Sequence, residues 1–224
     1  MHRETRQGKE TAREYALREL KENIISLALE PGNMVSENEI AAQLGISRTP
    51  VREALIELSR VNIVEILPQK GSRIMLIDYA MVEESRFLRL VLEREVVRML
   101  ASMEDRPDLD PLEENIRLQN FYLEHPHPEN LLELDNQFHA LLFRLANRMQ
   151  CYHWMEGLTI HFDRVRAMSL NAVTDIKIVS DHQAIAEAIK EKNAEFAGQL
   201  MERHLSRYKI DEYAIREKYP SYFR

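Results

Sequence analysis

Residues 45–55 constrain the fold most, because they predict a helix with one apolar face and one polar face. Ser47 can cap this helix, and Pro50 falls in its first turn, where a missing backbone N–H is harmless. At helical spacing the apolar side chains and the polar side chains separate onto different faces. The apolar face comprises Val51, Ala54, Leu55 and Leu58, and the polar face comprises Arg48, Thr49 and Arg52. The helix is therefore predicted to pack on one side and to contact a partner on the other.

A shorter helix is predicted just before it, starting at the capping-box pattern of Ser36 and Glu39 and ending at Gly45. Two short helices joined by a glycine-containing turn form a helix-turn-helix, whose second helix enters the major groove of DNA. Arg48 and Arg52 lie one turn apart, and arginine binds guanine or phosphate through two parallel hydrogen bonds. The pattern predicts double-stranded DNA as a partner.

The flanking segments extend this unit on both sides. Residues 11–29 have the apolar periodicity of an amphipathic helix that ends before Pro31 and Gly32. Residues 63–67 and 72–77 are two short apolar runs around a turn, which predicts a β-hairpin wing. Lys70 and Arg73 flank that turn, and we expect them to contact phosphates or the minor groove rather than to be ordinary surface charges.

Three spaced elements carry a family resemblance: residues 29–37, residues 46–55, and Gly71 close to Ile74. Together they resemble the winged-helix domain of the GntR family of bacterial transcription regulators, over roughly the first third of the chain. The resemblance implies that a defined set of side chains touches DNA. The set comprises Arg48, Thr49 and Arg52 on the second helix and Lys70 and Gly71 at the tip of the wing.

The charge distribution is compatible with DNA binding, although the net charge of −7 over 224 residues argues against it at first sight. Residues 1–77 contain 11 Lys and Arg against 11 Asp and Glu, so the acidic excess lies in residues 78–224, with 19 against 26. No signal peptide and no apolar run of membrane length occurs, and a single Cys151 excludes an internal disulfide. We therefore expect a cytoplasmic protein without membrane association.

The chain is predicted to be mainly α, with two domains. Residues 1–78 form a winged helix-turn-helix DNA-binding domain with a small β-hairpin wing. Residues 79–224 lack a strand pattern and form an all-α bundle of about six helices. The expected helices are 80–104, 110–124, 128–147, 151–170, 173–192 and 194–218.

Four polar residues are predicted to point into this bundle. Asp135 lies in an otherwise apolar stripe, and His139 follows one turn later on the same face. His182 and His204 lie on the apolar faces of two further helices. A buried carboxylate without a partner is unfavourable, and one divalent metal ion satisfies all four groups. Taken singly, each histidine is more often an ordinary core or surface residue than a ligand.

Arg89 and Glu93 one turn apart, then the Asp135 and His139 pair, and finally His182 and His204, form a spaced pattern. The pattern resembles the FCD ligand-binding domain, the effector module of the FadR-type branch of GntR regulators. The resemblance implies a divalent ion held by Asp135, His139, His182 and His204. The other histidines match no ligand position of the family, and we expect them on the surface or in loops: His2, His125, His127, His153 and His161.

The identity of the ion and of the effector is less constrained. Three imidazoles and one carboxylate suit zinc, nickel, iron or manganese, and zinc is favoured in competition in vitro. The resemblance implies that a small organic acid completes the coordination shell. Arg89 is a candidate second contact for that anion by bidentate pairing, and the equally weighted alternative is a surface salt bridge to Glu93.

The sequence thus predicts a ligand-responsive transcription regulator and not an enzyme. A homodimer would place two recognition helices on a palindromic operator, under control of a small carboxylate. Repression is the commoner behaviour in the family. Two alternatives stay open: a metal-sensing regulator, and a metal-dependent enzyme with an appended DNA-binding domain.

Overall fold

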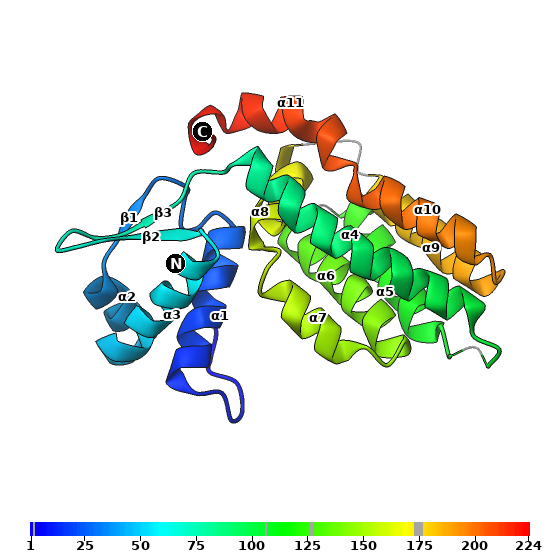
Figure 1. Cartoon of the computed structure of the whole chain (residues 1–224), viewed down its shortest axis with the longest axis horizontal. Helices are drawn as coiled ribbons and strands as arrows, with labels where there is room; N and C mark the ends of the chain where they lie inside the picture. Colours follow the sequence, from blue (N-terminus) through cyan, green and yellow to red (C-terminus); the bar gives the residue numbers. More distant parts are fainter. Residues whose placement is uncertain (2, 106, 126–127, 173–176) are drawn as a thin grey trace. The chain divides into compact units, whose positions relative to one another are not determined.

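The structure of the protein is a computed structural model, and it describes residues 1, 3–105, 107–125, 128–172 and 177–224. The chain forms two compact units (Figure 1). The first contains Met1–Met81 together with Tyr219–Arg224, and the second contains Val82–Lys218. A winged helix-turn-helix followed by a helical bundle confirms the predicted fold class.

The first unit packs three helices against a small antiparallel sheet of strand order β1-β3-β2 (Figure 1). The predicted hairpin is formed by β2 and β3, while β1 is an additional strand that the apolar pattern missed because it is so short. The elements are α1 (Ala12–Ile25), β1 (Met34–Val35), α2 (Glu37–Leu44), α3 (Arg48–Arg60), β2 (Val64–Leu67) and β3 (Gly71–Ile74).

One predicted helix end in this unit differs from the structure, and two expected capping hydrogen bonds are missing. Helix α1 ends at Ile25 and not near residue 29, because Leu27 has a left-handed backbone with φ of 65°. Ser36 and Ser47 are N-cap residues, but neither side chain makes the expected capping hydrogen bond. Gly45 ends α2 with φ of 69°, as predicted for a glycine at this position.

The C-terminal residues Tyr219–Arg224 belong to the first unit. Phe223 forms a parallel β-bridge with Ile77, and its ring stacks on that of Tyr79 with centroids 5.5 Å apart. Arg224 forms an ion pair with Asp78. The chain therefore passes between the two units twice, once after Met81 and once after Lys218.

The second unit contains eight helices in its described part rather than the expected six. The segment 151–170 is broken after Gly157, which caps α7, and the last segment is broken at Ser206 and Arg207. Part of the expected helix 173–192, residues 173–176, lies outside the described residues. The helices are α4 (Tyr79–Ser102), α5 (Asp110–Glu124), α6 (Pro128–Leu145), α7 (Met149–Glu156), α8 (Ile160–Ala172), α9 (Ile178–Lys190), α10 (Ala194–Leu205) and α11 (Tyr208–Lys218).

Candidate nucleic-acid interface and metal centre

Helix α3 has the two faces that its sequence predicts. Val51, Ala54, Leu55 and Leu58 are buried, with at most 1% of each side chain accessible, and they fix the helix against α1 and α2. The opposite face leaves Arg48 and Arg52 with 61% and 66% of their side chains exposed. Core packing thus holds a rigid helix while its arginines project outward.

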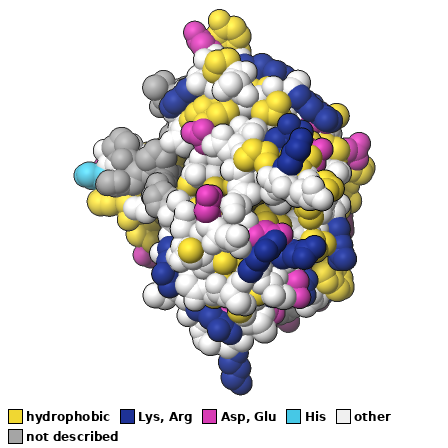
Figure 2. Space-filling model, turned by 90° about the vertical axis from the view of Figure 1, so that its left-hand side faces the viewer, with side chains coloured by type: hydrophobic (Ala, Val, Ile, Leu, Met, Phe, Trp, Pro, Cys, Tyr) yellow, Lys and Arg dark blue, Asp and Glu magenta, His cyan; other side chains and the backbone are white. Residues whose placement is uncertain are grey.

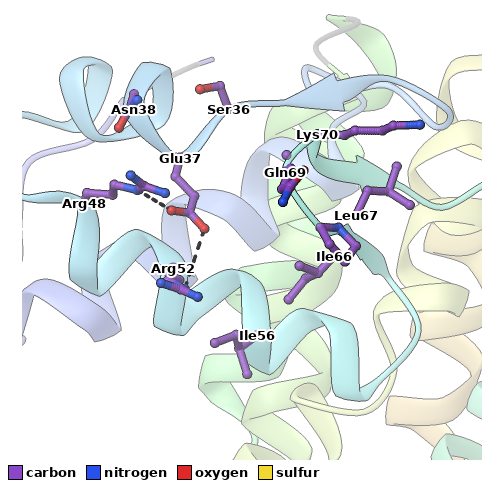
Figure 3. Close-up of a pocket in the computed structure, with 12 residues that line it drawn as sticks. Ser36, Glu37, Asn38, Arg48, Arg52, Ile56, Ile66, Leu67, Gln69 and Lys70 are labelled. Carbon is purple, nitrogen blue, oxygen red and sulfur yellow. Dashed lines mark hydrogen bonds and ion pairs between the residues drawn. The ribbon is translucent and has the colours of Figure 1, made fainter.

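The exposed face of α3 borders a cleft of about 460 Å³, whose other wall is the tip of the wing. In Figure 3, Arg48 and Arg52 lie on the helical side of the cleft, and Gln69 and Lys70 lie on the side of the wing. The cleft brings together four of the six predicted DNA contacts. These four are Arg48, Arg52, Lys70 and Gly71.

The other two predicted DNA contacts lie outside the lining of this cleft. Thr49 is exposed on α3, next to Arg48. Arg73 is on β3, where it forms a cross-strand ion pair with Glu65, with 2.5 Å between Nη2 and Oε2. Both remain on the surface of the first unit.

The backbone at the wing tip requires glycine. Gly71 has φ of 102°, and a Cβ at this residue would lie 3.0 Å from the carbonyl oxygen of Val35 on β1. The wing is therefore closed against β1 by an approach that only a glycine permits, and Lys70 directly before it stays exposed.

The surface of this region carries mixed charge. Figure 2 views the molecule from the side on which α2, α3 and the wing appear in Figure 1. Lys and Arg side chains form several separate groups there, with acidic and hydrophobic side chains between them. Local placement of arginines, rather than a broad basic field, distinguishes the candidate interface.

In the second unit, helices α6, α9 and α10 bring together one carboxylate and three imidazoles. Each residue offers one ligand atom, and all four atoms lie within 4.8 Å of one another. His204 Nε2 lies 3.2 Å from His139 Nε2 and 3.4 Å from His182 Nε2. Asp135 Oδ1 lies 3.3 Å from His182 Nε2. The four residues predicted as ligands are thus buried at one point, and we call this group the Asp/His cluster.

The other ring nitrogen of each histidine faces an oxygen acceptor. His139 Nδ1 contacts the carboxylate of Glu93 on α4, and His204 Nδ1 lies 3.7 Å from the carboxylate of Asp181 on α9. His182 Nδ1 lies 2.8 Å from the amide oxygen of Gln119 on α5. The contacts of His139 and His182 place the proton on Nδ1 and turn the Nε2 lone pair toward the centre. The carboxylate of Asp181 favours the same tautomer of His204, although 3.7 Å is too long for a hydrogen bond.

A chain of hydrogen bonds fixes the orientation of Gln119. The backbone carbonyl of Leu134 can only accept, and it accepts from the side-chain amide of Asn115 at 3.0 Å. Asn115 Oδ1 then accepts from Gln119 Nε2, which leaves Gln119 Oε1 to accept from His182. Since a backbone carbonyl sets the direction of the chain, the tautomer of His182 follows from the fold.

The donor set fits a divalent cation. Burial lowers the pKa of His139 and His182, and lowers that of His204 to about 4, so all three are neutral at physiological pH. Asp135 Oδ1 makes no hydrogen bond to any described residue, although it is buried. Three lone pairs and a carboxylate oxygen that converge without a proton between them repel one another unless a cation lies among them.

Further charged side chains surround the Asp/His cluster. Arg166 on α8 forms an ion pair with the second carboxylate oxygen of Asp135 and lies 2.7 Å from Asp163. Arg89 is 3.2 Å from Asp163 and 2.5 Å from Glu93. The Arg89 and Glu93 pair is buried, which corrects the surface salt bridge considered from the sequence. Although burial raises the pKa of Glu93, the Arg89 guanidinium and His139 hold it below its usual range.

Most of these supporting residues could not be recognised from the sequence. The sequence pairs Glu93 only with Arg89, assigns no role to Gln119 or Asp181, and leaves Arg166 open between the cavity lining and the surface. Asp181 had the clearest signal, because it directly precedes His182 on the same helix. The expected surface position of His161 is also wrong, since this residue is buried on α8. His2 and His127 lie outside the described residues.

We expect the metal-free protein to lose stability between about pH 6.5 and pH 4 through the Asp/His cluster. The unfolded chain binds a proton at each histidine near pH 6.5, while the folded chain does so only at lower pH. The free energy of unfolding should therefore decrease by about 1.4 kcal/mol per histidine for each unit by which the pH is lowered. Urea unfolding of chelator-treated protein at several pH values measures how the free energy of unfolding depends on pH. The same pH dependence in a His204→Gln variant as in wild type would contradict the assignment.

Comparison with known proteins gives consistent matches to both units. The FCD domain matches residues 84–207, and the bacterial regulatory proteins of the gntR family match residues 13–74. The HTH-type transcriptional repressor RspR of Escherichia coli is 31% identical, over 91% of this chain and 90% of its own. The gluconate operon transcriptional repressor of Bacillus subtilis is 27% identical, over 78% of this chain and 74% of its own.

Solved structures share the fold. McbR/YncC of Escherichia coli matches with a TM-score of 0.78 and 20% identity, over 93% of this chain and 99% of its own. A GntR-type regulator from Rhodococcus matches with a TM-score of 0.69 and 23% identity, over 92% of this chain and 96% of its own. Among the helices described, none has the length and apolar character needed to cross a membrane. The chain belongs to the GntR family of bacterial transcription regulators, in the branch that carries a C-terminal FCD domain.

Proposed function

We propose that this regulator is a repressor that binds a palindromic operator as a homodimer and is released by a small carboxylate bound at a metal ion. The observation that carries the proposal is the buried Asp/His cluster, whose four ligand atoms converge within 4.8 Å. The repressors among the relatives support the sign of regulation.

The DNA contacts of the proposal are made by α3 and the wing. Arg48 and Arg52 read base edges in the major groove, Thr49 contacts the adjacent backbone, and Lys70 and Gly71 contact the strand at the wing tip. Arg73 binds phosphate in exchange for its partner Glu65. A dimer presents two such surfaces to half-sites about one helical turn apart.

Asp135, His139, His182 and His204 hold the divalent ion, and zinc is the expected occupant in vitro. When bound, the ion supplies a Lewis-acidic centre for an oxygen of the effector. Glu93, Gln119 and Asp181 hold the three imidazoles in the ligating tautomer.

Charge balance supports an anionic effector. The linked side chains Arg89, Glu93, Asp135, Asp163 and Arg166 carry two positive and three negative charges. A divalent cation changes their sum from −1 to +1, and one monocarboxylate makes the site neutral. Asp163 contacts both arginines, so an incoming carboxylate competes with Asp163 for them, and Arg89 gains the role of a second anion contact.

A thermal-shift experiment tests this proposal with small carboxylates and sugar acids on chelator-stripped protein and on protein reloaded with zinc or nickel. We expect one acid to stabilise only the reloaded protein, by about 2.7 kcal/mol at a hundredfold excess over Kd. Asp163→Asn removes the competing carboxylate and should lower the Kd for that acid.

The other outcomes of the panel separate the alternatives. A shift with metal and none with any acid, together with metal-dependent DNA binding, would identify a metal sensor. The absence of a metal shift would remove the Asp/His cluster from the proposal and leave the DNA-binding half to be judged separately. For release, the effector must favour the DNA-free state, and a tenfold preference corresponds to about 1.4 kcal/mol.

A further inference from the structure

A carboxylate lies between the two arginines that project from α3. Glu37 is the first residue of α2, and its carboxylate contacts Nε of Arg48 and lies 3.9 Å from Nε of Arg52 (Figure 3). Only 19% of the Glu37 side chain is exposed, against 61% and 66% for the two arginines. The carboxylate therefore lies in the lining of the cleft beside the two arginines and is much less exposed than either of them.

An acidic side chain in this position repels phosphate, so it weakens non-specific attraction to DNA. It is also half-buried and engaged on both oxygens: Oε2 contacts Arg48 and Oε1 faces Arg52. Glu37 thus has both acceptor atoms directed to arginines rather than to the open cleft. Its arrangement suits the support of other side chains better than direct contact with a base.

Both contacts of Glu37 use the Nε edge of a guanidinium group. Arginine has a rigid planar fork, and a bidentate contact with guanine requires two parallel N–H groups. A carboxylate at Nε leaves the Nη1 and Nη2 edge available to a base and restricts the long side chain before DNA arrives. The arginine side chains then lose less conformational entropy when DNA binds, which makes the free energy of binding to the matching base more favourable.

We propose that Glu37 is a specificity-determining positioning residue, which presents the outer edges of Arg48 and Arg52 to the operator. The inference rests on the proposed DNA contacts of these arginines and adds the residue that orders them. It predicts opposite changes in affinity for operator DNA and for DNA of unrelated sequence. Removal of Glu37 should weaken binding to the operator while strengthening binding to unrelated sequence.

The test uses the full-length protein and a pool of random duplexes, from which each variant selects its own sites. The variants are wild type, Glu37→Ala, Glu37→Gln, Glu39→Ala, Arg48→Ala and Arg52→Ala. Glu39 is the matched control, because it is exposed on the same helix and its removal changes the net charge equally. Binding is then measured with the duplex preferred by wild type and with a scrambled duplex of the same composition.

For Glu37→Ala we expect an affinity at least tenfold lower for the preferred duplex and a higher affinity for the scrambled one. The dependence of log K on log salt should steepen, because released arginines neutralise additional phosphates. The selected sites should lose base preference at the positions lost in Arg48→Ala and Arg52→Ala. Glu37→Gln keeps one acceptor oxygen and should fall between Glu37→Ala and wild type.

Two results would overturn the inference. If Glu37→Ala and Glu39→Ala change affinity, salt dependence and base preference equally, Glu37 acts only through its negative charge. A loss of preference confined to a position that both arginine variants retain would show that Glu37 reads a base itself. The wild-type selection reports separately on the proposed function, because a regulator without sequence preference would enrich no site at all.

Discussion

Alanine at both Arg48 and Arg52 is expected to abolish specific operator binding while both units stay folded. The two side chains are more than 60% exposed, so their removal leaves the packing of α3 intact. A bidentate arginine–guanine contact contributes about 1–3 kcal/mol, and a homodimer loses four of them, so binding should weaken by roughly 1,000-fold or more. Fluorescence anisotropy with the duplex selected by wild type measures the change.

The matched control for this double variant removes two exposed arginines from the second unit. Arg117→Ala with Arg216→Ala changes the net charge by the same amount, and both side chains lie on the surface. We expect this control to bind within a few-fold of wild type. A protected footprint in the Arg48 and Arg52 double variant, or equal binding by the two double variants, would contradict the assignment of α3.

The recognition helix could be predicted because its determinants are local. The spacing of Val51, Ala54, Leu55 and Leu58 defines one buried face, and Gly45 marks the preceding turn by its left-handed backbone. The end of α1 could not be predicted in the same way. The apolar pattern continues past Ile25, but the backbone turns at Leu27, a residue that rarely adopts positive φ.

The breaks between helices of the second unit could not be predicted from the apolar pattern either. The break before α11 places Arg207 against Asp181, with 2.6 Å between Nη2 and Oδ1, although the two residues are 26 positions apart. Periodicity within one segment contains no information about that contact. Segments 151–170 and 194–218 were therefore expected as single helices, and the structure divides each of them into two.

The Asp/His cluster shows which part of a site a single sequence reveals. Asp135 and His139 stand out because polar groups interrupt an apolar stripe at helical spacing. Gln119 does not stand out, since a glutamine on an amphipathic helix is ordinary, and its role appears only when α5 and α9 pack together. The inward-facing polar side chains were predictable, and the residues that orient them were not.

His182→Gln is expected to reduce the affinity for zinc on the order of 100- to 1,000-fold. Structural zinc sites with four ligands contribute about 10–16 kcal/mol, so one ligand in four corresponds to about 2.5–4 kcal/mol. The variant should also lose the thermal stabilisation by metal that wild type shows. Competition with a chromophoric chelator measures the affinity, and the matched control is His161→Gln, which changes a buried histidine outside the Asp/His cluster.

The effect of Gln119 distinguishes a metal centre from a cluster of buried histidines. Gln119→Leu leaves all four ligand atoms in place but removes the acceptor that holds the proton on His182 Nδ1. If a cation is bound, this change should weaken zinc binding by about 10- to 100-fold, since residues that orient ligands have effects of this size. If the histidines only pack in the core, neither Gln119→Leu nor His182→Gln will differ from His161→Gln in metal content. A graded series, in which His182→Gln exceeds Gln119→Leu and both exceed His161→Gln, is the signature expected of a site whose tautomers are set by the fold.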